Sequence, residues 1–371
     1  MSKPLELLVF GTGAVGSVFG WRTAQNANVK LSAICRSNYE IVKNRGLTFR
    51  SNMWGTGSMR PVRVARHSNE LSHVKFDYVV CATKNKPQEE HALMRSLEPL
   101  LSKDTTLVLI QNGVEIEHPF RRAFPNHTLL SSICFASCSM QGSTVLQPAN
   151  IRPHGFHVGI HGNGNTSASK DEERLHTLVG LDPKFKAVDN IAAERWAKMA
   201  WNGAWNPATA LFGLETQDIL QHSPAGTSLV RQLAKEVIQV AQVYGVELPP
   251  NYEDEIIRMT EVEASIAPSM LQDLRRGQRM EVETICGTIC RMADQVGLPH
   301  PAMATAYRTL SEMNLACAET PLPARQDKPA LNMSQRIRAS VGARIGARIG
   351  ATAPSVGGLG MQQQQPHQIA A

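Results

Sequence analysis

A glycine-rich segment near the amino terminus has a spacing that suits the binding of a phosphate group. The segment GTGAVG occupies residues 11–16 and follows an apolar run at residues 5–10. Glycines at its first, third and sixth positions permit a tight turn, a close approach of the backbone to a pyrophosphate, and close packing of a helix on a strand. The amino end of that helix attracts negative charge. The pattern predicts a dinucleotide site made by Gly11, Thr12, Gly13, Ala14, Val15 and Gly16.

The residue after the second apolar run bears on which dinucleotide is bound. A carboxylate at this place accepts a hydrogen bond from the ribose 2′-hydroxyl of NAD. Here Arg36 follows the run at residues 29–35, and no Asp or Glu lies between residues 17 and 39. A guanidinium pairs with a 2′-phosphate through charge-assisted hydrogen bonds, which favours NADPH. The alternative is an arginine that meets only solvent.

Two further strand ends are predicted to face the same crevice. Lys84 follows the apolar run at residues 76–82, and Asn112 follows the run at residues 106–110. Ligands of open α/β sheets bind outside the carboxyl ends of the strands, so the joint placement makes both residues candidates. Taken singly, an exposed lysine and a turn asparagine ahead of Gly113 are the simpler interpretations.

Three polar residues recur at steps of four in the apolar stretch at residues 190–205 and just beyond it. Lys198, Asn202 and Asn206 form one stripe, because four residues rotate a helix by about 40°. Asparagine is a poor helix former, and an asparagine before Pro207 is expected to end or kink the helix. The amides are therefore expected to have partners, either a ligand or the backbone of a neighbouring domain. A stripe that faces solvent is the alternative.

Ser269 and Glu281 are weaker candidates. Ser269 opens the segment SMLQ, which is typical of a capping box at the start of a helix, although its hydroxyl could still face a ligand. Glu281 lies about 120° around a straight helix from Ser269, so the two share a face only if Gly277 permits a bend. The residues alone give Glu281 no role.

These residues need a sheet and a helical region to position them. The first 115 residues alternate short β-branched runs with helix-like stretches, which predicts an α/β domain of the Rossmann type with a doubly wound parallel sheet. Residues 129–164 contain short strands broken by Gly, Pro and Asn, which suggests extra sheet at the far edge of this domain.

Beyond residue 190 the chain is predicted to be all α-helical, with amphipathic segments at residues 190–205, 225–245, 269–297 and 301–316. A chain of 371 residues exceeds what one core usually organises. The predicted division is a cofactor domain at residues 1–185, a helical domain at residues 186–320, and a tail at residues 321–371.

Composition limits the class of protein. Of the net charge of +6, most belongs to residues 325–371, which carry six basic residues, one acidic residue and no aromatic residue, so this tail is expected to be disordered. The body is nearly neutral, and no specific nucleic acid partner is expected. No apolar stretch approaches membrane-spanning length and no signal peptide is recognisable, so no membrane partner and a cytoplasmic location are expected. The seven scattered cysteines suggest reduced thiols and no metal site.

Together these motifs resemble the ketopantoate reductases (2-dehydropantoate 2-reductases). The most specific combination is RWxKxxWNxxxNP at residues 195–207 followed by SMLQD and Glu281, and the order and spacing match from residue 5 to about residue 315. The resemblance implies a Rossmann domain, a helical domain, and a cleft between them for NADPH and ketopantoate. It also implies a place in pantothenate and coenzyme A biosynthesis.

The resemblance also implies residue roles. Lys198 would be the general acid, and an ammonium aimed at the ketone oxygen would both stabilise developing charge and supply a proton. Glu281 would position Lys198 and the cofactor. The ketoacid is assigned to Asn112, Asn202, Asn206 and Ser269, and NADPH to the glycine-rich segment with Arg36, Lys84, Asn112 and Glu281.

Two other functions stay open. The first is an NADPH-dependent reductase of another branched 2-oxo acid, because the motifs define the carbonyl and the carboxylate better than the alkyl group. The second is an NADPH-binding regulatory protein without turnover. A monomer and a homodimer are both compatible with the sequence.

Overall fold

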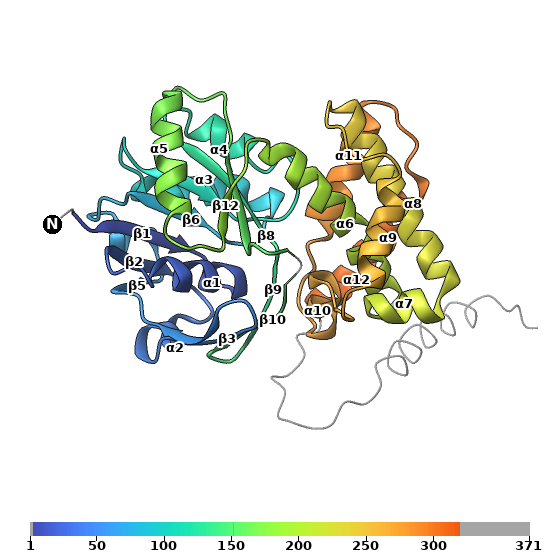
Figure 1. Ribbon diagram of the computed structural model, residues 1–371, viewed down its shortest axis with the longest axis horizontal. Coiled ribbons are helices and arrows are strands. Elements are labelled where there is room, and N and C mark those ends of the chain that lie inside the picture. Colours follow the sequence, from blue (N-terminus) through green and yellow to red (C-terminus); the bar gives the residue numbers. More distant parts are fainter. Residues whose placement is uncertain (1–2, 151, 320–371) are drawn as a thin grey trace, which may run out of the picture. The chain divides into compact units, whose positions relative to one another are not determined.

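The computed structural model describes residues 3–150 and 152–319. The tail predicted from residue 321 onward lies outside these described residues. Figure 1 shows the strands in the blue-to-green part of the chain and the helices beyond residue 190 in its green-to-orange part. A mainly parallel sheet covered by helices comes first along the chain, and a region of helices alone follows it. This order confirms the predicted fold class.

Eight strands form the main sheet, in the order β12-β11-β8-β7-β6-β1-β2-β5. Neighbouring strands are parallel except for β11 and β8, which are antiparallel. The inner strands β6 and β7 are buried at every residue, as expected for a sheet covered on both faces. The strand bounds are β1 (Leu5–Phe10), β2 (Val29–Ile34), β5 (Arg63–Ala65), β6 (Tyr78–Cys81), β7 (Thr106–Leu109), β8 (Leu129–Cys134), β11 (Phe156–Ile160) and β12 (Phe185–Ala187).

Alternate side chains of β1 enter two different cores. Leu7 and Val9 pack in one core with Phe19 of α1, whereas Leu8 packs in the other with Leu97 of α3. Since successive strand residues point to opposite faces, helices cover both faces of the sheet. The helices of this part are α1 (Ala14–Thr23), α2 (Tyr39–Asn44), α3 (Glu90–Leu97), α4 (His118–Ala123) and α5 (Ala168–Val179), with short 3-10 turns at Ser68–Leu71, Pro87–Glu89 and Glu98–Leu100.

Residues 129–164 form strands, as predicted, and these strands divide between the main sheet and a second sheet. Its four strands have the order β4-β3-β10-β9, and they are β3 (Leu47–Ser51), β4 (Gly55–Met59), β9 (Ala136–Gln141) and β10 (Thr144–Asn150). Of the strands in this segment, β9 and β10 belong to the second sheet. The strand β8 belongs to the main sheet, where it lies between β7 and β11 and is buried along its whole length. Short strand-like runs indicate that a segment is extended, but they do not show which sheet it joins.

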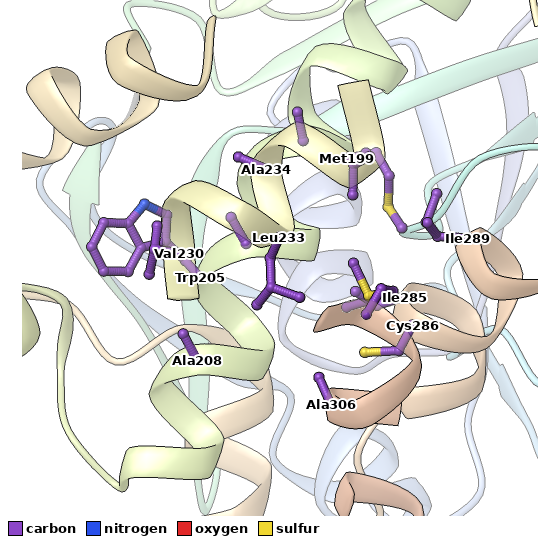
Figure 2. Packing of buried hydrophobic residues seen from close by; sticks show 14 of the residues in the cluster. Met199, Trp205, Ala208, Val230, Leu233, Ala234, Ile285, Cys286, Ile289 and Ala306 are labelled. Atoms are coloured by element: carbon purple, nitrogen blue, oxygen red, sulfur yellow. The ribbon is translucent and has the colours of Figure 1, made fainter. Parts of the chain in front are cut away.

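The helical part is built around α6 (Ile191–Phe212). Figure 2 shows Met199, Trp205 and Ala208 of α6 packed among apolar side chains that include Val230, Leu233, Ile285 and Ala306. The other helices are α7 (Thr216–His222), α8 (Pro224–Val243), α9 (Tyr252–Glu261), α10 (Ser269–Arg275), a π-helical turn at Glu283–Gly287, α11 (Thr288–Gln295) and α12 (Pro301–Glu319). None of the helices in the described part of the chain is long and apolar enough to cross a membrane.

The helix α6 does not end at Asn206, which is one of the two outcomes predicted there, but continues through Pro207 to a left-handed Gly213. The prediction of one continuous segment at residues 269–297 was wrong. The segment at residues 269–297 is not one helix, since α10 ends at Arg275 and Gly277 has a positive φ of 64°. Helical periodicity does not reveal such a break, because the apolar residues on each side of it keep a similar spacing.

Candidate active site

The glycine-rich loop joins β1 to α1, and two of its glycines are required by their contacts. Gly11 has a φ of +101°, and a Cβ atom there would lie 2.9 Å from Thr83 Cγ2. A Cβ atom at Gly16 would collide with the carbonyl oxygen of Gly11. Gly13 differs, because a Cβ atom there would have no protein atom within 4 Å. The space beside Gly13 is therefore open to a ligand that approaches the backbone.

A pocket of about 880 Å³ adjoins this loop. Five of the predicted cofactor residues line it, namely Gly11, Thr12, Gly13, Arg36 and Lys84. The other five do not, namely Ala14, Val15, Gly16, Asn112 and Glu281. The carboxyl ends of β1, β2 and β6 thus meet at one pocket, as the strand-end argument predicts.

The charged side chains that line this pocket are mostly cationic. Glu89 is the one acidic residue among the described lining residues, against five cations: Arg36, Arg66, Lys84, Lys86 and Arg95. A concave wall of one charge sign raises the local concentration of oppositely charged ligands. The pocket is therefore suited to a ligand with several phosphate groups.

Lys84 connects the sheet to the helical part. Its ammonium lies 2.6 Å from the Asp273 carboxylate of α10 and donates to the Arg279 carbonyl oxygen at 3.1 Å. Burial raises the pKa of Asp273, and the charge of Lys84 opposes that shift. Lys84 thus links the wall of the pocket to the helical part of the chain while its own side chain stays partly exposed.

Lys198, Asn112 and Glu281 form a hydrogen-bonded chain. The Lys198 ammonium donates to Asn112 Oδ1 at 3.0 Å and to the Cys134 carbonyl oxygen at 2.7 Å. The amide nitrogen of Asn112 donates to Glu281 Oε2 at 3.4 Å, and the backbone N–H of Asn85 donates to Glu281 Oε1 at 3.2 Å. One asparagine therefore bridges the predicted acid and the predicted positioning carboxylate.

Burial perturbs both ionisable ends of this chain. Burial lowers the pKa of Lys198, the charge of Arg195 lowers it further, and the nearby Cys134 thiol and Glu281 oppose these effects. Burial raises the pKa of Glu281, against the opposing charge of Lys84. A lysine whose pKa is lowered toward neutrality gives up its proton more readily, which suits a general acid.

The two other asparagine candidates have different surroundings. Asn202 is buried and lines a small cavity beside Lys198 with Asn112 and Gly113. Asn206 lies deeper along α6, where its Oδ1 accepts from the Met270 backbone N–H at 3.0 Å. The predicted polar stripe therefore faces the site and the neighbouring helix.

The predicted capping box at Ser269 was wrong. Pro268 is the N-cap residue of α10, and no side chain caps this helix. The Ser269 hydroxyl instead donates to Asn206 Oδ1 at 3.2 Å. This hydrogen bond joins two of the predicted substrate residues.

A buried arginine next to the lysine was missed by the sequence analysis. Arg195 lies one turn before Lys198, is 5% exposed, and donates to the carbonyl oxygens of Gln111 and Gly113 at 2.8 and 3.0 Å. Its Nε lies 2.9 Å from the Glu117 carboxylate, which also accepts from the Ser131 hydroxyl at 2.5 Å. Arg195 therefore fixes the loop that carries Asn112 to the helix that carries Lys198.

The sequence contains a signal for this network. Arg195 lies four residues before Met199, so helical periodicity places it on the same buried face of α6. A charged residue on an apolar face indicates a buried ionic partner. Its partner Glu117 lies in a loop, where no periodicity marks it.

Comparison with known proteins fits this geometry. The family model described as Ketopantoate reductase PanE/ApbA matches residues 7–164, and the model described as Ketopantoate reductase PanE/ApbA C terminal matches residues 190–314. The solved structure of 2-dehydropantoate 2-reductase from Methylococcus capsulatus is 30% identical, has a TM-score of 0.72, and covers 85% of this chain and 99% of its own. This chain belongs to the ketopantoate reductase family.

Two other relatives show the range of likeness. A 2-dehydropantoate 2-reductase of Nostoc sp. is 24% identical over 303 residues, which cover 81% of this chain and 93% of that relative. The ternary structure of a D-mandelate dehydrogenase with NADH and anilino(oxo)acetate is 18% identical, with a TM-score of 0.73 and coverage of 85% of this chain and 99% of the other. The second likeness concerns the fold alone. By their names, the proteins compared with this ketopantoate reductase family member are oxidoreductases.

Proposed function

We propose that this protein reduces 2-dehydropantoate (ketopantoate) to pantoate with NADPH, a step of pantothenate and coenzyme A biosynthesis. The observation that carries the proposal is the Lys198 ammonium, held by Asn112 and the Cys134 carbonyl oxygen at the junction of sheet and helices. In our proposal, residues 1–185 bind the cofactor and residues 186–320 supply the acid and most substrate contacts.

The residues of the large pocket fit NADPH. The open space beside Gly13 admits a pyrophosphate, and the cationic lining suits three phosphate groups. In this proposal the glycine-rich loop holds the pyrophosphate and Arg36 holds the 2′-phosphate. The part of NADPH that faces the helical domain is held by Lys84, Asn112 and Glu281. When bound, NADPH supplies the hydride that reduces the ketone carbon.

The proposed role of Lys198 follows from charge development. A ketone carbon that gains a hydride leaves negative charge on its oxygen, and a nearby ammonium stabilises that charge. Lys198 then transfers a proton from Nζ to this oxygen, which completes the hydroxyl group of the product. Asn112 fixes the direction of Nζ, and Glu281 fixes Asn112 through its amide nitrogen.

The amides of the helical part suit the rest of a 2-oxo acid. Asn202, beside Lys198, is proposed to bind the substrate, as are Asn206 and Ser269, which already contact each other. Neutral hydrogen-bonding groups can hold a hydroxyl and a carboxylate without adding a competing charge near Lys198.

A panel of 2-oxo acids tests the substrate assignment. We expect ketopantoate to give a kcat/KM at least about tenfold above other branched 2-oxo acids, because in this proposal the site also binds its hydroxyl group, whereas the carboxylate is common to all of them. NADPH oxidation with purified protein measures each value. A higher kcat/KM for another branched 2-oxo acid would favour the sister-reductase alternative.

Substitution of two glycines tests the cofactor loop. Gly13→Ala is expected to raise the Kd for NADPH by about tenfold, since its Cβ atom enters the open space that the pyrophosphate would use. The melting temperature should change little, because the φ of −66° at Gly13 suits alanine. Titration of NADPH by fluorescence measures the Kd.

Gly16→Ala is the matched control for this experiment. Its Cβ atom would collide with the Gly11 carbonyl oxygen and lie 2.8 Å from Ala82 Cβ, so overpacking should lower stability by about 1–3 kcal/mol. An unchanged Kd for NADPH in Gly13→Ala would show that the ligand lies elsewhere.

A further inference from the structure

Two arginines follow neighbouring parallel strands at the far end of the large pocket. In the register of β2 with β5, Ile34 lies opposite Ala65, and the backbone N–H of Cys35 donates to the Ala65 carbonyl oxygen at 3.0 Å. Arg36 comes two residues after the end of β2, and Arg66 comes directly after β5. Both line the pocket, so the sheet register brings their backbones together at one wall.

The side chain of Arg66 is held in place by contacts outside the pocket. Its guanidinium carbon lies 4.1 Å from the centre of the Tyr39 ring, and its Nη2 lies 2.6 Å from Glu40 Oε1. The Arg66 and Glu40 side chains are 45% and 66% exposed, so this ion pair is weak. A phosphate dianion can therefore share or replace the Glu40 carboxylate while the stacking on Tyr39 continues to orient the guanidinium.

The other charged groups of the pocket are engaged or come from other elements. The ring of His67 accepts from the backbone N–H of Glu70 in a capping box and is therefore already engaged. Lys84 pairs with Asp273, and Lys86 pairs with Glu89. Arg95 belongs to α3, and no strand register places it beside Arg36.

We propose that Arg66 is a second cation for the 2′-phosphate of NADPH and shares this group with Arg36. The inference rests on the proposed function, because only NADPH among the two nicotinamide dinucleotides carries that phosphate. A phosphate monoester has a charge between about −1.5 and −2 at neutral pH, so one guanidinium does not neutralise it. Two guanidinium groups on neighbouring strand ends match both its charge and its several acceptor oxygens.

Binding of two small fragments tests this inference without turnover. The probes are 2′,5′-ADP, which carries the 2′-phosphate, and 5′-AMP, which lacks it, and calorimetry measures both affinities. We expect the unmodified protein to bind 2′,5′-ADP at least about tenfold more tightly than 5′-AMP. Arg66→Ala should weaken 2′,5′-ADP about tenfold and 5′-AMP less than about twofold, and Arg66→Lys should lie between these values because it keeps the charge but not the fork geometry.

Two further variants make the outcomes distinct. Arg36→Ala should lose selectivity as Arg66→Ala does, whereas Arg95→Ala, the matched control, should change both affinities by the same factor. If Arg36→Ala loses the selectivity and Arg66→Ala keeps it, the inference is wrong and the NADPH proposal stands. An equal loss of selectivity in Arg95→Ala also overturns it, since general charge would then explain the effect. If the unmodified protein binds both fragments equally, the NADPH assignment and this inference fail together.

Discussion

Replacing Lys198 with alanine should lower kcat by about a hundredfold or more, which is the usual scale for the loss of a positioned acid or an oxyanion donor. The Lys198 ammonium is fixed by Asn112 and the Cys134 carbonyl oxygen, so its position does not depend on the substrate. The Kd for NADPH should change little, because Lys198 does not line the large cationic pocket. Steady-state kinetics and a separate NADPH titration measure the two effects.

The pH dependence of kcat provides a second test of the role of Lys198. Only protonated Lys198 can donate, so kcat should fall as the pH rises through the pKa of Lys198. Burial and Arg195 lower that pKa from the ordinary value of 10.5, which moves the decline to lower pH. The decline should be absent from the residual activity of Lys198→Ala.

Lys198→Arg separates proton transfer from charge. Arginine keeps the positive charge but does not release a proton in proteins, so kcat should stay low if Lys198 is the acid. Near-normal kcat in this variant would indicate a purely electrostatic role. A raised KM with an intact kcat in Lys198→Ala would instead mean that the lysine only binds the substrate carboxylate.

Glu117→Gln should lower the free energy of unfolding by about 3–5 kcal/mol, because it leaves the buried Arg195 without its counter-charge. Glu117 and Arg195 are each 5% exposed, so water cannot replace the lost carboxylate. Chemical denaturation at neutral pH measures the change. Asp254→Asn is the matched control, since the side chains of its ion pair with Arg231 are 48% and 42% exposed and the pair should contribute less than about 1 kcal/mol.

The same pair makes stability depend on pH. Burial acts to raise the pKa of Glu117, but the charge of Arg195 and the Ser131 hydrogen bond outweigh it and lower the pKa. Its contribution to stability is therefore fully present above the unfolded-state pKa and is lost as the pH falls through the folded-state pKa. Glu117→Gln should lack this part of the acid sensitivity. If Glu117→Gln lowers the free energy of unfolding no more than Asp254→Asn does, the Glu117–Arg195 pair does not stabilise the site.

Local sequence signals predicted the inner strands of the main sheet and the edge of the sheet at which the pocket lies. The runs at residues 29–35 and 76–82 became β2 and β6, because short apolar β-branched runs are stable mainly as inner strands. Strand ends of a parallel sheet share one edge, so the places of Arg36 and Lys84 at the pocket followed from those runs.

Features that depend on contacts between distant segments were not predictable in the same way. Glu281 reaches Asn112 only because α10 ends and Gly277 turns the chain, and helical periodicity does not report that turn. The strand β3 pairs with its neighbour β4 and also with β10, almost a hundred residues later, and no local signal encodes the second pairing. Glu117 likewise pairs with Arg195, which lies far from it in the sequence.

The most direct test of the proposed reaction is product formation from ketopantoate and NADPH by the unmodified protein. We predict that one pantoate forms for each NADPH oxidised, with a kcat of about 1 per second or more, as is usual for enzymes. Tight binding of NADPH without any pantoate would contradict the account, and would instead support an NADPH-binding protein without turnover.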